Sequence, residues 1–240
     1  MPLGAAQFNL HQLMGSLRTS EETPAGVLTK EARPVRPFVT ISRQAGSGGI
    51  RFGRMLAERL NRSLPANQHP WNSLDRELVE RIAHDHHLAT ELIDSLEKSS
   101  HTWIEEFISG FSHSDHSPSD VAVFRRVMLT MRALARAGHF ILVGLEGEQM
   151  THGMPGGLHV RIIAPFAWRV KNLARNDGLS EEDARHRVKL LDEDRNAFAA
   201  KFWPHVDHTE SFHVTLNASL LSEEQMAVCV VPLIGSSLPG

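Results

Sequence analysis

Apolar and polar residues alternate along the chain in a pattern typical of strands separated by helices. The runs "FVTIS" from residue 38, "HFILVG" from residue 139 and "LHVRIIAP" from residue 158 are short and rich in branched apolar residues, as in buried strands. Between these runs, apolar residues recur at helical spacing. Strands joined through helices pair in parallel by right-handed crossovers. The pattern therefore predicts an α/β domain in which helices cover both faces of a parallel sheet.

The boundaries of the first elements follow from local signals. The segment "GIRFGRMLAERL" predicts a helix at about 50–61, after a first strand near 38–42 and a loop at 43–49. A short second strand is expected near Trp71. After the polar stretch "GFSHSDHSPSD", apolar residues recur at close to helical spacing and predict a helix. We expect this helix to end at Gly138, because glycine is the usual residue at a helix C-terminus.

The last third of the chain predicts further elements of the same kinds. Ser180 with Asp183 resembles an N-terminal capping pair, and it opens a helix of about 22 residues. A strand in "FHVTLNAS" and a helix from Ser222 to about Val231 complete the domain.

Composition divides the chain into three regions. Residues 1–36 are rich in Gly, Ser, Thr and Pro and end in "RPVRP", which predicts a flexible N-terminal extension. Residues 37–231 are expected to form one domain, and residues 232–240 a C-terminal tail.

Overall composition narrows the class of protein. The chain has 240 residues, of which 41% are hydrophobic and 22% charged, and this suits a globular domain with a full core. No apolar run approaches the roughly 18 residues needed to cross a bilayer, and the N-terminus lacks a secretory signal, so we expect a cytoplasmic protein without a membrane partner. The single cysteine, Cys229, excludes a disulfide scaffold. A net charge of −3 argues against a nucleic-acid partner.

Histidine is unusually frequent. Six of the 15 histidines lie between residues 84 and 116, namely His84, His86, His87, His101, His113 and His116. Two of them at i, i+3 spacing share a helical face, but no H-E-x-x-H pattern or cysteine partner completes a metal site. We therefore expect a polar helical region here, with a metal-sensing role as a distant alternative.

The stretch "TISRQAGSGGIRFGRMLAERL" predicts a phosphate-binding loop between a strand and a helix. Gly46, Ser47, Gly48 and Gly49 allow successive backbone N–H groups to point at one place, next to the positive end of a helix dipole. The spacing is not that of a dinucleotide fingerprint, because Arg51 stands at its third glycine. A tight strand–helix connection without a ligand is the alternative.

The order of several motifs resembles the cytidylate kinase-like proteins. "TISRQAGSGG", "LDRELVERIA", "HFILVG", "HVRIIAPFAWRV", "LSEEDA" and "DEDR" carry the resemblance, which extends over about residues 37–231. It implies a three-layer P-loop NTPase fold similar to adenylate kinase, with a helical substrate lobe at about 73–120 and a lid at about 165–203. It also implies ATP and Mg²⁺ as cofactors and a nucleoside monophosphate or similar small phosphate acceptor as substrate.

Two departures from the kinase pattern affect the expected chemistry. Gly49 stands where cytidylate kinases have the loop lysine, as it does in the cytidylate kinase-like branch, and Arg51 stands at the threonine that helps to hold magnesium. Arg43, Arg51 and Arg54 are the nearby cations. After "ILVG", Leu145 replaces an arginine of the family.

Glu146 follows Leu145 and is a weak candidate for a carboxylate near the metal. A solvated loop residue is the alternative, because single acidic residues in such turns usually serve no ligand.

The resemblance places further functional residues late in the chain. It aligns Arg169 in "APFAWRV" with the lid arginine of the family, and Asp192 and Arg195 in "LDEDR" with a D-x-x-R near the end of the lid. These three residues are the expected catalytic group, because phosphoryl transfer needs positive charge on the migrating phosphoryl group. An ordinary ion pair at i, i+3 is the alternative for Asp192 and Arg195.

Acceptor-binding residues are expected in the substrate lobe. Asp75 begins this lobe and either binds a ribose or base edge or caps a helix. Arg125 or Arg126 lies near the position where family members hold the acceptor phosphate. Trp103, Phe107 and Phe111 recur at helical spacing and are expected in the core.

The sequence supports two functional hypotheses. The first is an ATP-dependent phosphotransferase of the nucleoside monophosphate kinase type. The second is a nucleotide-binding regulatory module that kept the fold and lost turnover, and Gly49 and Leu145 favour it. The acceptor and the oligomeric state do not follow from the sequence.

Overall fold

The computed structural model describes residues 35–65, 68–85, 93, 96, 98–109, 118–203, 206 and 210–235. The expected extension at 1–36 and tail at 232–240 therefore lie largely outside the described residues. Four histidines of the cluster and one expected core residue also lie outside them, namely His86, His87, His113, His116 and Phe111. Within the described part of the chain, no helix has the combination of length and apolar character that a membrane span requires.

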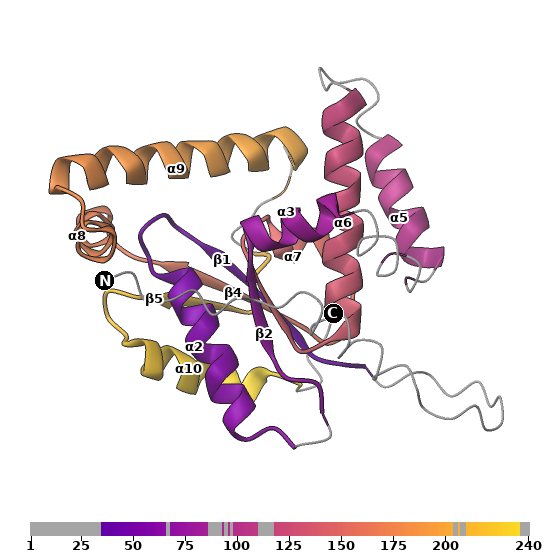
Figure 1. The fold of residues 1–240 in the computed structure, drawn as a ribbon, viewed down its shortest axis with the longest axis horizontal. Coiled ribbons are helices and arrows are strands. Elements are labelled where there is room, and N and C mark those ends of the chain that lie inside the picture. The colour runs from indigo at the N-terminus through magenta and orange to yellow at the C-terminus, as the bar shows by residue number, and fades with distance from the viewer. Residues whose placement is uncertain are drawn as a thin grey trace.

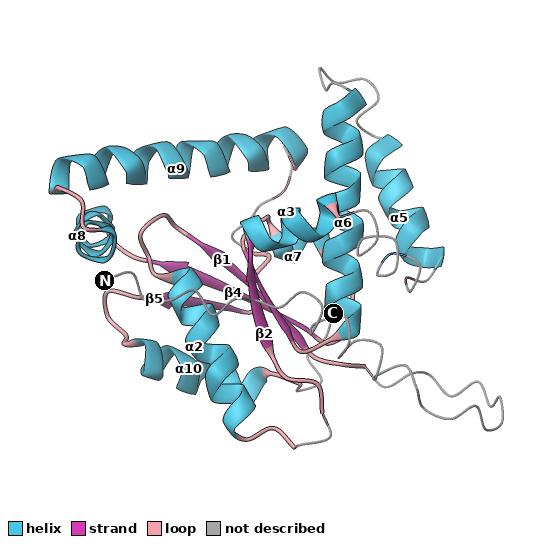
Figure 2. Cartoon of the chain, in the orientation of Figure 1, coloured by secondary structure: helices cyan, strands magenta, loops and turns pink. Residues whose placement is uncertain are grey.

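A five-stranded sheet forms the centre of the fold, and its strand order is β2-β3-β1-β4-β5. Each neighbouring pair of strands is parallel, which confirms the predicted parallel sheet (Figure 2). The strands are β1 (Phe38–Arg43), β2 (Asn72–Asp75), β3 (Phe140–Val143), β4 (Gly157–Ile163) and β5 (Val214–Asn217).

Helices cover both faces of this sheet. They are α2 (Gly49–Arg62), α3 (Arg76–His84), α5 (Lys98–Ser109), α6 (Pro118–Ala137), α7 (Gly147–Met150), α8 (Phe166–Asp177), α9 (Glu181–Phe202) and α10 (Glu223–Val230), followed by the 3₁₀ helix η1 (Val231–Leu233). In Figure 1, α2 and α10 lie together on one side of the sheet, whereas α3, α5 and α6 lie together away from them. The predicted three-layer arrangement is confirmed.

The alternation of side chains along each strand explains the two layers, because successive residues of a strand point to opposite faces. Val39 and Ile41 of β1 pack with Phe52 and Leu56 of α2. Phe38 is three residues before Ile41 and so points to the other face, where it packs in the opposite core with residues of α3 and α6. The carboxyl ends of β1, β2 and β3 meet at the edge where the glycine-rich loop leaves the sheet.

Several predicted boundaries agree closely with the structure. The helix predicted at about 50–61 is α2, and the long helix predicted after Ser180 is α9. The Ser180 hydroxyl accepts a hydrogen bond from the Asp183 amide at 3.1 Å, so the predicted cap is present. Ser222 caps α10 in the same way, with Gln225 completing a capping box. The short helix α7 was not predicted, because four residues are too few to show a helical period.

An aromatic cluster attaches the carboxyl end of α9 to the helices beside the sheet. Phe202 of α9 stacks on Phe124 of α6, with ring centroids 3.8 Å apart and planes at 10°. Trp203 lies 5.7 Å from the ring of Phe107 in α5. Phe107 is thus a core residue, as its spacing predicts. Stacked and edge-on aromatic pairs add to the stabilisation that burial provides.

A half-buried histidine, His159, lies on the opposite side of β1 from α2. Nδ1 of His159 in β4 shares a hydrogen bond of 2.8 Å with the Thr40 hydroxyl, and the His159 amide donates to Nδ1 of His213 at 3.0 Å. Burial, together with the smaller effects of His213 and His152, lowers the pKa of His159 from 6.5 to about 4. His159 is therefore neutral in the folded protein at physiological pH.

This lowered pKa predicts a loss of stability in mild acid. The unfolded chain takes up a proton at His159 near pH 6.5, whereas the folded chain does so only near pH 4. The stabilisation is therefore fully present above pH 6.5 and is lost as the pH falls toward 4. Between pH 7 and pH 5, the free energy of unfolding should fall by about 2 kcal/mol more in the native chain than in His159→Gln.

Urea denaturation at a series of pH values measures this difference. His186→Gln is the control, because His186 is exposed on α9, and it should keep the native pH dependence. Identical pH slopes for the native chain and His159→Gln would contradict the prediction.

Candidate functional site

The glycine-rich loop joins β1 to α2 as predicted. Gly46 and Gly48 have φ values of 76° and 88°, in the left-handed region that favours glycine. Gly48 is the N-cap of α2, so the first amides of this helix face the loop. The Ser47 hydroxyl donates to the Gln44 carbonyl at 2.8 Å and closes the turn.

Two helices that follow much later in the sequence hold this loop from the side. Arg169 of α8 is 6% exposed, and its Nη1 donates to the Ala45 carbonyl at 2.9 Å and to Asp192 Oδ2 at 2.5 Å. Asp192 of α9 accepts from the Ala45 amide through Oδ1 at 2.8 Å. The pair therefore binds both backbone polar groups of one loop residue, Ala45. Asn172 of α8 adds a bond of 2.8 Å to the Gly46 carbonyl.

These contacts give Asn172 a role that the sequence analysis missed. Asn172 is 4% exposed, and its side chain bonds the loop, Arg175 and Asn176. An asparagine in the middle of an amphipathic helix carries no motif, so its contact with the loop was visible only in three dimensions.

Two further arginines gather at the carboxyl edge of the sheet. Arg43 ends β1, and Arg195 of α9 donates to its carbonyl at 3.4 Å. Burial, together with the smaller effect of the positive charge of Arg195, lowers the pKa of Arg43 to about 10. Burial also lowers the pKa of Arg195, against the opposing effect of Asp192, whose Oδ1 is 3.7 Å away. Both side chains remain cationic at neutral pH, although burial removes part of the water that would stabilise their charges.

The turn after β3 has an unusual backbone. Gly144, Leu145 and Glu146 have φ values of 95°, 61° and 47°. The left-handed region is unfavourable for the last two residues, because they carry a Cβ. The Leu145 side chain is 9% exposed and packs into the core between the sheet and α6. The residue at the family's arginine position therefore contributes to packing instead of charge.

Acidic side chains lie beside this turn. Glu146 is near enough to Arg43 and Arg195 to affect the pKa of both. Glu148 of α7 is 2% exposed, and neither of its carboxyl oxygens has a hydrogen-bond partner among the described residues. Burial raises the pKa of Glu148 well above its usual value, and the charge of Glu146 raises it further. Glu148 was not predicted, since a second acid in "GLEGEQ" has no distinctive spacing.

Arg51 and Asp75 make structural contacts. Arg51 pairs with Glu223 of α10 and bonds Asn176 of α8 at 3.5 Å, so its charge is directed along the outer side of α2. Asp75 caps α3 by accepting from the Leu78 amide at 3.2 Å. The capping role weighed in the sequence analysis is therefore observed for Asp75.

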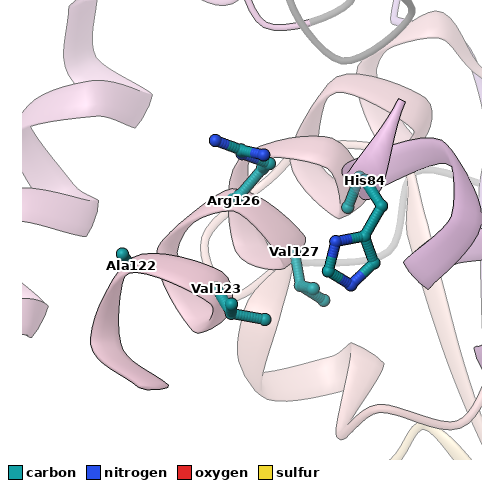
Figure 3. Close-up of a pocket in the computed structure, with 6 residues that line it drawn as sticks. His84, Ala122, Val123, Arg126 and Val127 are labelled. Carbon is teal, nitrogen blue, oxygen red and sulfur yellow. The ribbon is translucent and has the colours of Figure 1, made fainter. Parts of the chain in front are cut away.

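Arg125 and Arg126 lie on α6, and neither has a hydrogen bond or ion pair to the loop. Arg125 Nε donates to Glu105 of α5 at 2.7 Å. Arg126 lines an open pocket of about 90 Å³ between the end of α3 and the first half of α6 (Figure 3). The other lining residues are Ala83, His84, Ala122, Val123 and Val127.

The contact between the loop and α8 predicts a severe effect of Gly46→Ala. A Cβ at Gly46 would lie 2.5 Å from the Arg169 carbonyl oxygen, so the loop or α8 must move. Gly178→Ala is the matched control, since Gly178 has a φ of 67° and no atom within 4 Å of its Cβ position. The control should cost about 1 kcal/mol of unfolding free energy from backbone strain alone, and Gly46→Ala distinctly more. Equal costs in urea denaturation would contradict the tight packing of loop on α8.

Comparison with known proteins identifies the family. The family model described as the cytidylate kinase-like family matches residues 38–220. No match was found among curated proteins. An uncharacterised protein from Eubacterium ventriosum shares the fold, with a TM-score of 0.63 and 17% identity over 84% of this chain and 99% of that chain.

Two more distant solved structures also match. A shikimate kinase from Acinetobacter baumannii in complex with shikimate has a TM-score of 0.42 and 15% identity over 83% of this chain and 93% of its own. TT1252 from Thermus thermophilus has a TM-score of 0.41 and 17% identity over 85% of this chain and 100% of its own. Because the family model covers most of the described domain, the chain belongs to the cytidylate kinase-like family.

Proposed function

We propose that this protein is an ATP-dependent phosphotransferase that acts on a nucleoside monophosphate or a similar small phosphate acceptor. One observation carries the proposal. The backbone amides of Gly46, Gly48 and Gly49 have no hydrogen bond to any described residue, and they lie at the N-terminus of α2. Unbonded amides at a helix N-terminus favour an anion such as phosphate. Kinase-like family membership supports a nucleotide as the source of that phosphate.

The three residues expected in catalysis divide into two roles in this proposal. Arg195 lies beside Arg43 at the sheet edge, where its guanidinium would stabilise negative charge that develops during transfer. Arg169 and Asp192 would act through the loop, because their polar groups already bind Ala45 and each other. They position the amides that receive the donor phosphates.

Magnesium fits this site only together with a nucleotide. Among the described residues, no group of three or more His, Cys, Asp or Glu side chains is arranged to hold a metal ion. Nucleotide enzymes commonly bind Mg²⁺ through one or two carboxylates together with phosphate oxygens, and the ion neutralises charge on the phosphates. Glu146 is the carboxylate at the end of β3 that would serve here.

The regulatory module remains the second candidate. The Ala45 amide is already occupied by Asp192, and Arg51 is paired with Glu223, so part of the usual donor site is used for internal contacts. Such a chain would bind ATP without turning it over.

Turnover by Arg195→Ala tests the enzyme proposal. Loss of an arginine that stabilises transferring charge commonly lowers turnover by about 10³-fold, and ATP affinity should fall much less. Arg187→Ala is the control on the same helix, because Arg187 is exposed and pairs with Asp177 at 3.2 Å. ADP formation is measured with each common nucleoside monophosphate, and ATP affinity by calorimetry. ATP binding without turnover by the native chain would support the regulatory module, whereas full activity of Arg195→Ala would refute the role of Arg195.

Two substitutions of Glu146 distinguish the effect of its carboxylate charge from the effect of its strained backbone. Glu146→Gly should raise the free energy of unfolding by about 1 kcal/mol, because glycine adopts a φ of 47° without a Cβ clash. Glu146→Gln keeps the strain and should leave stability nearly unchanged. If the carboxylate serves magnesium, both variants should require more Mg²⁺ for half-maximal turnover. An unchanged Mg²⁺ requirement in both would remove Glu146 from the metal site.

A further inference from the structure

Gly49, the first residue of α2, leaves a space that another side chain fills. A Cβ at Gly49 would lie 2.8 Å from Cβ, 3.0 Å from Cγ and 3.2 Å from Cδ of Arg43. The aliphatic part of Arg43 therefore runs along the position from which a side chain at residue 49 would start. Any such side chain, including lysine, would have to displace Arg43.

A second glycine receives the charged end of Arg43. A Cβ at Gly144 would lie 2.1 Å from Nη1 and 2.8 Å from Cζ of Arg43. The side chain thus passes from the end of β1, across the start of α2, to the end of β3. Two residues without side chains, Gly49 and Gly144, make this path possible.

The charge at the end of this path has no partner. Among the described residues, none forms a hydrogen bond or ion pair with the Arg43 guanidinium. Burial and the neighbouring Arg195 lower its pKa to about 10, so it is still protonated at neutral pH. Asp75 and Glu146 act on this charge only from a distance, so a half-buried cation without a direct partner remains, and an anion that binds there lowers its desolvation cost. The unbonded amides of Gly46, Gly48 and Gly49 point to the same kind of ligand.

We infer that Arg43 replaces the missing loop lysine and binds the terminal phosphates of the donor, and that Gly49 and Gly144 are glycines because they admit its side chain. The inference rests on the proposed function. A guanidinium differs from a lysine ammonium in presenting a planar fork, which can hold two phosphate oxygens at once. The positive charge therefore comes from the strand before the loop instead of the helix after it.

The affinity for inorganic triphosphate tests this role apart from catalysis and from recognition of the base. Arg43→Met keeps the aliphatic stem and removes the charge. It should lower the affinity for triphosphate and for ATP by the same factor, about 10- to 100-fold, because charge-assisted hydrogen bonds to phosphate are lost. Arg59→Met is the control, since Arg59 is exposed in the last turn of α2. It should bind both ligands as the native chain does.

Stability without ligand distinguishes ligand binding from a structural role. Removal of an unpartnered buried charge should leave the unfolding midpoint of Arg43→Met unchanged or higher, while the upward shift that triphosphate causes is reduced. A lower midpoint together with native triphosphate affinity would show that Arg43 is structural and would overturn the inference.

A charge exchange provides an independent test if Arg43→Met does not fold. Gly49→Lys alone should lose triphosphate affinity, because the lysine displaces Arg43. The double variant Arg43→Ala with Gly49→Lys should bind more tightly than either Gly49→Lys or Arg43→Ala, since it returns the charge to the helix. If the two substitutions lower the triphosphate affinity independently, so that their free-energy effects simply add in the double variant, the proposed exchange of charge is contradicted. Failure of the native chain to bind either ATP or triphosphate would instead refute the proposed function itself.

Discussion

The site depends on the contact among Arg169, Asp192 and the backbone N–H and C=O groups of Ala45. The ion pair is short, and the Arg169 side chain is only 7% exposed. Desolvation of such a pair is costly, so it contributes most when every polar group has a partner. Here the carbonyls of Ala45 and Ala164 and the amide of Ala45 supply those partners. The loop conformation, and with it the direction of the free amides, follows from this arrangement.

Helix α9 contacts two parts of the molecule, the glycine-rich loop with β1 and the helices α3 and α6. Near its middle, α9 is bound to the loop through Asp192 and to β1 through Arg195. At its end, Phe202 stacks on Phe124 of α6, and Arg76 of α3 lies over the ring of Phe198. The segment that resembles a kinase lid is thus in contact with both the phosphate loop and the helices that follow β2.

Charge is distributed unevenly around the carboxyl edge of the sheet. Arg43 and Arg195 are both partly desolvated there, and Glu146 and Asp75 act on Arg43 in the opposite direction. Burial raises the pKa of the nearby Glu148 well above its usual value, which disfavours a second negative charge at the turn after β3. Two arginines and two carboxylates thus meet here, and the unbonded amides at the helix N-terminus add the partial positive charge that favours an anionic ligand.

The sequence by itself determined the architecture and the location of the loop. Buried strand runs, helical spacing and capping residues are local signals, and they predicted β1, α2 and α9 to within one or two residues. The glycines of the loop were also predicted, because left-handed backbone favours glycine wherever it occurs. The resemblance to cytidylate kinase-like proteins then added Arg169, Asp192 and Arg195 as residues to examine, which spacing alone does not connect.

Only the tertiary structure decided what those residues touch. Ala45 and Asp192 are 147 positions apart, and Arg43 meets glycines from two different elements. Arg51, a plausible phosphate ligand by position, is directed toward Glu223, while Asn172 and Glu148 carry no motif. Side-chain direction depends on which elements pack together, and packing joins residues that are distant in the chain. The sequence therefore predicted where phosphate chemistry is expected, and the fold determined which arginine there has no hydrogen-bond or ion-pair partner among the described residues.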